Sequence, residues 1–314
     1  MNQLVKKRIL LSAVTALLAF NYPKRAQAQS LHRLPIKTVR DLHAYFKWIP
    51  NKPPIISGHR GGTVKGFAEN SLASFENTLK YTPAFFETDP RLTKDSVIVL
   101  LHDASLDRMT TGTGKLSDYT WEELKKLRLK DAQGNVTQQR IPTLDEAIEW
   151  ARGKTVLNLD RKDVPFSMTA AIIRKHKADA FVILTVHSPE QARYYYEDNK
   201  DRMFSAFIKN KQELEAYEKA GIPAANLIAY IGPTIKTENK ELYQLLNGKG
   251  IMCMISAASS YDKLPDEQER FSAYRAIIED GASILESDRP IEVAQALKLL
   301  QTNQPTSASS TKIK

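Results

Sequence analysis

Three carboxylates stand where apolar runs of the sequence end. Glu87 and Asp89 are two residues apart, so in a strand both side chains point to one face. Asp160 ends a later apolar run and can supply a third oxygen ligand. Neighbouring carboxylates repel, and one takes up a proton unless a cation lies between them. A ligand set of oxygens without cysteine predicts a divalent cation, Mg²⁺ or Ca²⁺, rather than structural zinc. The alternative is a buried ion-pair network with Arg60, Arg91 or Lys162.

His59 and Arg60 lie in a glycine-rich turn, Ser57-Gly58-His59-Arg60-Gly61-Gly62, directly after another apolar run. Glycine lets backbone N–H groups approach an anion closely, and an arginine side chain offers two parallel donors to a phosphate. We therefore expect Arg60 to bind phosphate and His59 to take part in proton transfer.

His102 follows the apolar run Val97–Leu101, which a short polar turn joins to the run that carries Glu87. So short a connection predicts an antiparallel hairpin. With the turn centred between Lys94 and Asp95, His102 would lie opposite Glu87, about 5 Å away. Two histidines at a carboxylate cluster beside an arginine predict cleavage of a phosphodiester, one taking a proton while the other protonates the leaving group.

Other polar residues follow apolar runs and are weaker candidates. His187 and Lys209 could contact a substrate, whereas His32, His43 and His176 are expected on the surface. Glu286 and Asp288 also end a run, but Arg289 offers them a structural ion-pair partner.

The elements that position these residues repeat a pattern of a short apolar run, a polar break and a helical stretch. Continuous apolar runs suit strands buried on both faces, as in parallel sheets. Eight such units predict an α/β fold, the (β/α)₈ TIM barrel, with the site at the carboxyl ends of the strands. The runs are Ile55–Ser57, Phe85–Glu87, Val156–Leu159, Phe181–Leu184, Phe204–Phe207, Leu227–Tyr230, Ile251–Met254 and Ser283–Leu285.

Local signals mark the helices and one insertion. Thr143-Leu144-Asp145-Glu146 predicts a capping box, Ser188-Pro189 a helix start, and Gly221 and Gly281 helix ends. Residues 103–140, after the second strand and its hairpin, form an insertion with a capping box of its own at Thr120–Glu123. A connection of this length at a barrel mouth is usually functional.

The two ends of the chain differ from the rest. Residues 1–28 have the basic start, apolar core and Ala26-Gln27-Ala28 site of a signal peptide cleaved near Ala28, which predicts export to the periplasm or the extracellular space. Residues 29–304 would form the barrel, and the polar residues 305–314 a disordered tail. The ends hold seven unopposed basic residues, so the net charge of +9 falls to +2 on the folded part. This balance argues against a nucleic-acid partner, and no strong membrane signal stands out. Cys253, the single cysteine, is expected to be a buried structural thiol.

Several motifs in order resemble the glycerophosphodiester phosphodiesterase family, over nearly the whole chain after residue 28. They are His59-Arg60-Gly61, Glu69-Asn70-Ser71, Glu87-Thr88-Asp89, His102-Asp103 with Arg108 and Thr110–Gly114, Ile141–Glu146, and Asn158–Lys162. The resemblance implies a PLC-like TIM barrel that hydrolyses glycerophosphodiesters, small-molecule substrates, to glycerol phosphate and an alcohol with a divalent cation.

The resemblance also implies roles for particular residues. His59 and His102 would do acid–base work, Glu87, Asp89 and Asp160 would bind the metal, and Arg60 and Lys162 the phosphate. The family usually has glutamate where this chain has Asp160, and one methylene fewer shortens the reach by about 1.3 Å. The alternatives are a lysophospholipase D or phosphoinositide-cleaving activity on the same barrel, or a non-catalytic binder of phosphate ligands.

Overall fold

The computed structural model describes residues 30–303. The predicted signal peptide, residues 1–28, and the predicted tail at 305–314 lie outside the described residues. None of the helices in the described part of the chain has the length and apolar composition needed to cross a bilayer.

Eight parallel strands close into a barrel in the order β1-β10-β9-β8-β7-β6-β5-β2. Each coincides with one of the eight apolar runs, so the predicted TIM barrel is confirmed. Residues 57–59 of β1 pair with residues 85–87 of β2, which closes the ring. The barrel strands are β1 (Ile55–His59), β2 (Phe85–Thr88), β5 (Leu157–Leu159), β6 (Val182–Val186), β7 (Met203–Phe207), β8 (Leu227–Gly232), β9 (Met252–Ser256) and β10 (Ile284–Ser287).

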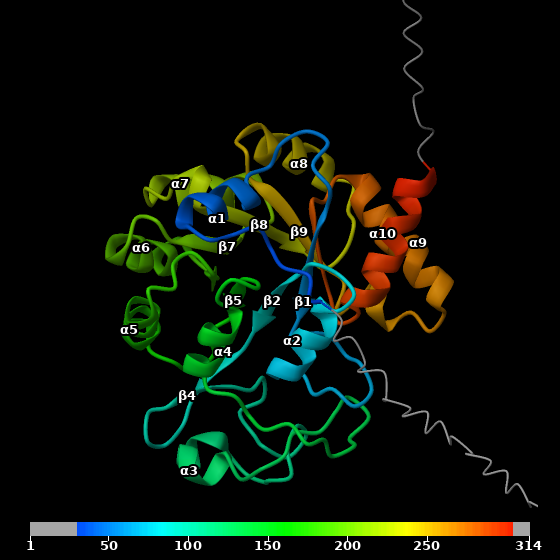
Figure 1. Ribbon diagram of the computed structural model, residues 1–314. Coiled ribbons are helices and arrows are strands. Elements are labelled where there is room, and N and C mark those ends of the chain that lie inside the picture. Colours follow the sequence, from blue (N-terminus) through cyan, green and yellow to red (C-terminus); the bar gives the residue numbers. More distant parts are fainter. Residues whose placement is uncertain (1–29, 304–314) are drawn as a thin grey trace, which may run out of the picture. The chain divides into compact units, whose positions relative to one another are not determined.

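Helices surround the strands (Figure 1). They are α1 (Val39–Phe46), α2 (Leu72–Leu79), α3 (Trp121–Leu124), α4 (Leu144–Ala151), α5 (Phe166–His176), α6 (Pro189–Asp198), α7 (Lys211–Lys219), α8 (Asn239–Gly248), α9 (Glu267–Asp280) and α10 (Pro290–Asn303). The predicted capping boxes at Thr143 and Thr120 are present, and Ser188 caps α6. Helix α9 ends at Gly281, whose φ of +128° is strained for other residues.

Alternation along the strands divides the barrel interior into two layers. The lower layer is apolar, and α1 covers it with Leu42 and Phe46, which are almost fully buried. Two residues further along most strands, the inward positions become polar, for example Ser57 above Ile55 and Glu286 above Ile284. The apolar layer makes the barrel stable, and the polar layer above it forms the floor of the site.

The predicted hairpin is present, but its predicted register is wrong by one residue. Strand β3 (Pro90–Leu92) pairs antiparallel with β4 (Ile98–Leu100), with Arg91 opposite Val99. The turn is closed by Thr93 N–H on the Val97 carbonyl, and it holds three residues centred on Asp95. A turn with an odd number of residues shifts the pairing by one residue from the predicted register, so His102 does not lie opposite Glu87. The hairpin forms its own two-stranded sheet, separate from barrel strand β2.

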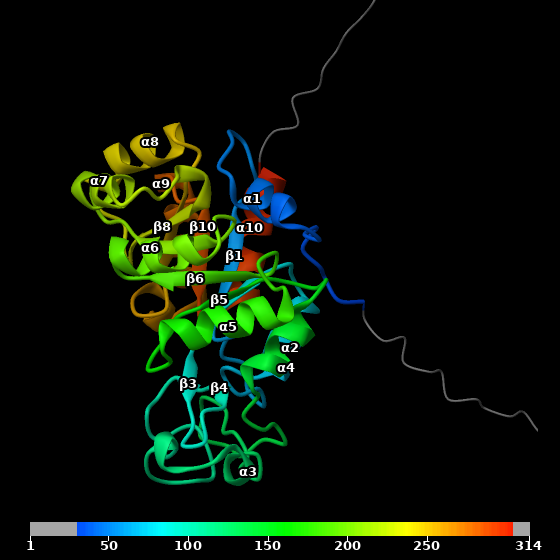
Figure 2. The same ribbon diagram turned by 90° about the vertical axis from the view of Figure 1, so that its left-hand side faces the viewer.

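The segment between β4 and α4 folds around a small core of its own. Its buried residues include Leu106, Met109, Leu116 and Leu124, which pack on Val99 of the hairpin rather than on the barrel core. Figure 2 shows β3, β4 and α3 together beside the barrel. This second core gives the segment a fixed shape next to the strand ends.

Candidate active site

Strands β1, β2, β5 and β10 deliver acidic or basic residues to the same end of the barrel. His59 ends β1 and is paired in register with Glu87 of β2. Glu87, Asp89 and Asp160 each place one carboxylate oxygen within 4.8 Å of the others, a spacing at which one metal ion could be held. Asp89 is 1% exposed and Glu87 is 6% exposed. The carboxylate cluster predicted from the strand ends is therefore present.

Two basic side chains compensate part of this negative charge. Lys162 Nζ lies 2.8 Å from Asp89 Oδ1 and 2.5 Å from Asp160 Oδ2. Arg60 Nε lies 3.3 Å from Asp89 Oδ2. The ion-pair alternative is therefore correct for Lys162 and Arg60. It is wrong for Arg91, which pairs with Asp163 on the outside of the cluster.

Glu87 is left without such compensation. Its Oε2 atom is buried and accepts no hydrogen bond among the described residues, and the nearest cationic atom is His59 Nε2 at 3.6 Å. Burial and the neighbouring charge of Asp89 raise the pKa of Glu87 well above its usual value. A buried, unpaired carboxylate oxygen is costly unless a cation meets it. The residues present therefore fit a divalent cation held by Glu87, Asp89 and Asp160.

Asp160 is held firmly despite its short side chain. Its Oδ1 accepts a hydrogen bond from His187 Nε2 at 3.0 Å, and its Oδ2 contacts Lys162. Burial alone would raise the pKa of Asp160, but His187 and Lys162 lower it to about 2. Asp160 is therefore an ionised, oriented carboxylate, and His187 acts on the site through it.

His59 has a partner at each ring nitrogen. Nδ1 lies 2.6 Å from Asp288 Oδ1, and Nε2 faces Glu87. Burial would lower the pKa of His59, but the bond to Asp288 and the charges of Glu87 and Glu286 raise it to about 9. The imidazole is thus oriented with one nitrogen toward the carboxylate cluster.

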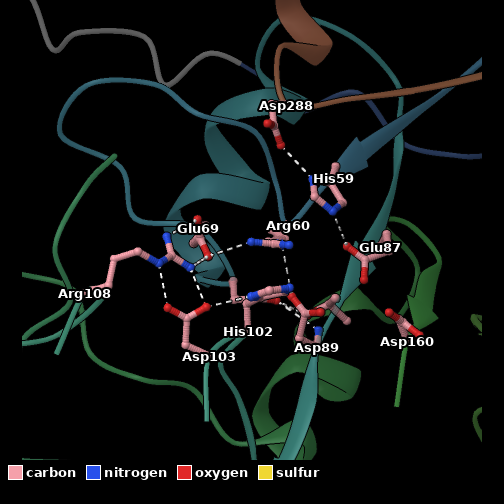
Figure 3. Close-up of polar contacts among 12 residues, drawn as sticks. His59, Arg60, Glu69, Glu87, Asp89, His102, Asp103, Arg108, Asp160 and Asp288 are labelled. Carbon is pink, nitrogen blue, oxygen red and sulfur yellow. Dashed lines mark hydrogen bonds and ion pairs between the residues drawn. The ribbon is translucent and has the colours of Figure 1, made fainter. Parts of the chain in front are cut away.

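His102 reaches the site by a different route from the one expected. Its carbonyl accepts hydrogen bonds from Arg91 at 2.8 Å and 2.6 Å, which fixes the end of the hairpin. Its Nδ1 bonds to Asp103 Oδ1 at 2.7 Å. Figure 3 shows His59 between Asp288 and Glu87, whereas His102 is joined to Asp103. Both predicted histidines lie in the same group of polar residues, each with an aspartate on Nδ1.

A network that sequence reasoning missed connects Asp103 with Arg60. Arg108 binds Asp103 at 2.6 Å and Glu69 at 3.0 Å, and Glu69 also binds Arg60 at 3.1 Å. These residues belong to the quoted motifs, but only the fold reveals that they contact one another. The network links the segment after β4 to the glycine-rich turn after β1 that carries Arg60 (Figure 3).

Asn70 orients one carboxylate of the cluster, Asp89, by hydrogen bonds. It is fully buried, with φ of +56°, and donates from Nδ2 to Asp89 Oδ2 at 2.7 Å. Its Oδ1 accepts from Thr88 Oγ1 and from the Asp89 N–H. The side chain therefore fixes the end of β2 and with it the direction of Asp89.

A cavity of about 590 Å³ opens at this end of the barrel. His59, Arg60, Glu87 and Asp160 line it, together with serine and threonine hydroxyls, Phe207 and Tyr230 from the other strands. Asp89, Lys162 and His102 are not among its lining residues. Asp89 contacts the lining residue Arg60, and Lys162 contacts Asp160. His102 is connected to the lining residue Arg108 through Asp103.

The weaker sequence candidates fall into different places. His187 bonds to Asp160, and Lys209 lies over the rings of Phe207 and Tyr230. His32 is exposed, as expected, but His43 and His176 are partly buried and bonded to neighbouring groups. The expected pairing of Arg289 with Glu286 or Asp288 is wrong, because Arg289 pairs with Glu292.

Together these features define a closed α/β barrel with three clustered carboxylates and two histidines in the polar group at the carboxyl ends of its strands. The chain belongs to the glycerophosphoryl diester phosphodiesterase family, whose model matches residues 59–259.

Solved structures and curated relatives agree with this assignment. A glycerophosphoryl diester phosphodiesterase from Parabacteroides distasonis is 53% identical, with a TM-score of 0.86 over 90% of this chain and 98% of that one. A phosphodiesterase from Oleispira antarctica, solved with the product sn-glycerol-3-phosphate, shares the fold at 20% identity, covering 82% of this chain and 99% of its own, with a TM-score of 0.59. A glycerophosphodiester phosphodiesterase from Caldanaerobacter subterraneus is 38% identical over 104 residues, which is 33% of this chain and 42% of the relative. The chain thus matches less than half the length of this curated relative.

Proposed function

We propose that this protein hydrolyses glycerophosphodiesters to glycerol phosphate and an alcohol with the help of a divalent cation. The observation that carries the proposal is the unpaired, buried Glu87 oxygen among three carboxylates, with His59 on one side and Arg60 beside it. The family assignment and the relatives' names support the substrate class.

The chain's residues would divide the reaction between them. Arg60 and Lys162 bind and orient the phosphate, since both cations face the carboxylate cluster. Water attacks phosphorus, and the bond from phosphorus to the alcohol oxygen breaks. One histidine of the pair His59 and His102 accepts the proton of the water, and the other donates a proton to the departing oxygen. A cation on Glu87, Asp89 and Asp160 would neutralise charge on the phosphate, and hard oxygen ligands favour Mg²⁺ or Ca²⁺.

An activity panel tests this proposal. The full chain is incubated with glycerophosphocholine, -ethanolamine, -glycerol and -inositol in the presence of Mg²⁺, Ca²⁺ or Mn²⁺, and glycerol phosphate is measured. We expect release that stops when a chelator is added. Activity on lysophospholipids or phosphoinositides alone would replace the proposed substrate class. Binding of glycerol phosphate without any turnover would show a non-catalytic ligand binder.

Export is a separate proposal. Residues 1–28 carry the composition of a signal peptide, and the barrel follows directly. Fractionation of expressing cells, with N-terminal sequencing of the exported chain, should find a new N-terminus near Ala28. Retention of Met1 on cytoplasmic protein would contradict the proposal.

A further inference from the structure

Asp288 contacts a residue that the proposed reaction needs. It follows β10 directly, and its Oδ1 lies 2.6 Å from His59 Nδ1. With Nδ1 bound in this way, Nε2 is the nitrogen that faces Glu87. In histidines that transfer protons, the partner of one ring nitrogen decides which tautomer is present and where the ring points.

The direction of this hydrogen bond follows from the charge of Asp288. Burial would raise the pKa of Asp288, but the bond to His59 lowers it, so the side chain is an ionised carboxylate. A carboxylate only accepts hydrogen bonds. Nδ1 of His59 therefore donates to Asp288, so the single proton of the neutral ring lies on Nδ1, and Nε2 is the nitrogen that gains or loses a proton.

The backbone of Asp288 is held on both sides. Its carbonyl accepts from the Thr63 N–H at 2.6 Å and from Thr63 Oγ1 at 3.0 Å. Its N–H donates to Asp262 Oδ2 at 2.6 Å. Thr63 belongs to the turn after β1, so these bonds connect the segment that carries His59 with the segment that carries its partner.

Asp262, the acceptor of the Asp288 N–H, is itself buried and fixed by hydrogen bonds. It is 3% exposed and accepts hydrogen bonds from Ser287 Oγ at 2.9 Å and from Tyr274 OH at 2.7 Å. Tyr274 lies on α9 and is itself fully buried. The turn after β1, Asp262 and, through Asp262, helix α9 thus hold Asp288 in place.

A purely structural role for Asp288 has little support. Its other ionic partner, Lys263, lies 3.6 Å away with a side chain that is 67% exposed. Exposed pairs of this kind contribute little to stability. Arg289, the structural partner expected from the sequence, binds Glu292 instead.

We propose that Asp288, supported by Asp262, is the positioning residue that holds His59 as the Nδ1–H tautomer with Nε2 turned toward the carboxylate cluster. The inference rests on the proposed phosphodiesterase function. It extends that function to a series of hydrogen bonds that runs from the buried Tyr274 and Asp262 through Asp288 to His59, of which only His59 belongs to the motifs quoted above.

The kinetic test replaces Asp288 by asparagine, whose amide can donate to Nδ1 and so favours the wrong tautomer. We expect Asp288→Asn to lower kcat at least about 100-fold with KM within about threefold of wild type, as for His59→Ala. Asp118→Asn, an exposed aspartate on the segment after β4, serves as the control and should keep wild-type kinetics. A kcat of Asp288→Asn within threefold of wild type overturns the inference, provided the wild type is active.

A spectroscopic test does not depend on turnover. Two-bond ¹H–¹⁵N spectra of the wild type report which imidazole nitrogens carry protons, and the His59 signals are those lost in His59→Gln. The spectra are recorded above the His59 pKa of about 9, where the neutral ring carries one proton, and we expect that proton on Nδ1 in the wild type and on Nε2 in Asp288→Asn. A His59 whose Nδ1 carries no proton in the wild type contradicts the inference, even where Asp288→Asn does not fold. If the wild type hydrolyses no substrate, the proposed function fails while these spectra still decide the tautomer.

Discussion

The two histidines share a partner type but differ in their surroundings. His59 bonds to Asp288 inside the barrel end and faces Glu87. His102 bonds to Asp103, which Arg108 holds from a side chain that is 51% exposed. The His59 pair is therefore fixed by the barrel itself, whereas the His102 pair depends on the segment after β4.

Replacing His102 by alanine should remove one of the two proton-transfer groups. We expect kcat to fall at least about 100-fold, the usual contribution of acid–base catalysis, because His102 is one of the two histidines proposed to transfer protons. Steady-state kinetics on the most active substrate of the panel measure the effect. His32→Ala, at an exposed position, is the control. Near-normal turnover of His102→Ala would show that the assignment is wrong.

Replacing Glu87 by glutamine should weaken cation binding. The amide keeps the volume of the side chain but removes the charge of the buried oxygen that has no hydrogen-bond donor. We expect affinity for the cation to fall at least about tenfold, in the range seen for altered metal sites. Calorimetric titration of the metal-free protein measures it, with Glu122→Gln on the exposed helix α3 as control. Unchanged affinity would place the cation elsewhere.

At the scale of elements, the strand ends converge because parallel strands in a barrel all point the same way. The turn after β1 and the end of β2 are joined by Asn70, which contacts Thr88 and Asp89. The hairpin contributes a third group of residues to the site, because Arg91 of β3 donates a hydrogen bond to the carbonyl of His102. The site is thus assembled from short segments that each depend on a few hydrogen bonds.

Replacing Asn70 by alanine should test this dependence. The change leaves Thr88 Oγ1 and the Asp89 N–H without their acceptor, and it removes a donor from Asp89 Oδ2, which keeps its ion pair with Arg60. We expect a loss of about 2–4 kcal/mol in the free energy of unfolding, measured in urea. Asn51→Ala is a matched control, because Asn51 also has a positive φ, +62°, but is exposed. Equal losses in both variants would trace the effect to backbone strain alone.

The eight barrel strands could be predicted from the sequence because each is a continuous apolar run between polar breaks. The carboxylate cluster followed from Glu87, Asp89 and Asp160 at the strand ends. The hairpin register could not be predicted, because the polar sequence Thr93-Lys94-Asp95-Ser96 is compatible with a three-residue turn and with a four-residue turn. The two turns differ in the hydrogen bonds that Thr93 makes. The partner of Asp288 was also hidden, because Arg289 is adjacent in sequence while His59 is adjacent only in the fold.

At the scale of the whole barrel, the helices cover the outer face of the closed sheet, and the side chain of Cys253 faces Asn247 of helix α8. Cys253 lies on β9 and is 0% exposed, as predicted for a structural thiol. Burial raises the pKa of the Cys253 thiol far above its usual value, so the reactive thiolate is scarce at neutral pH.

Alkylation should therefore report on the integrity of the barrel. We expect iodoacetamide to leave the native protein unmodified at pH 8 for hours and to modify Cys253 within minutes in denaturing urea. Mass spectrometry of the intact chain counts the adduct. Rapid modification without denaturant would mean that β9 opens easily.

The separate core of the segment after β4 has a consequence for how the protein fails on heating. A cluster that packs on itself and on the hairpin can melt as a cooperative unit while the barrel stays folded. Such partial melting would release Asp103 and His102 but leave β1, β2 and the hydrogen bond between Asp288 and His59 intact. Enzyme activity would then disappear at a lower temperature than the helical circular dichroism, and it would return on cooling as long as the barrel itself had not opened.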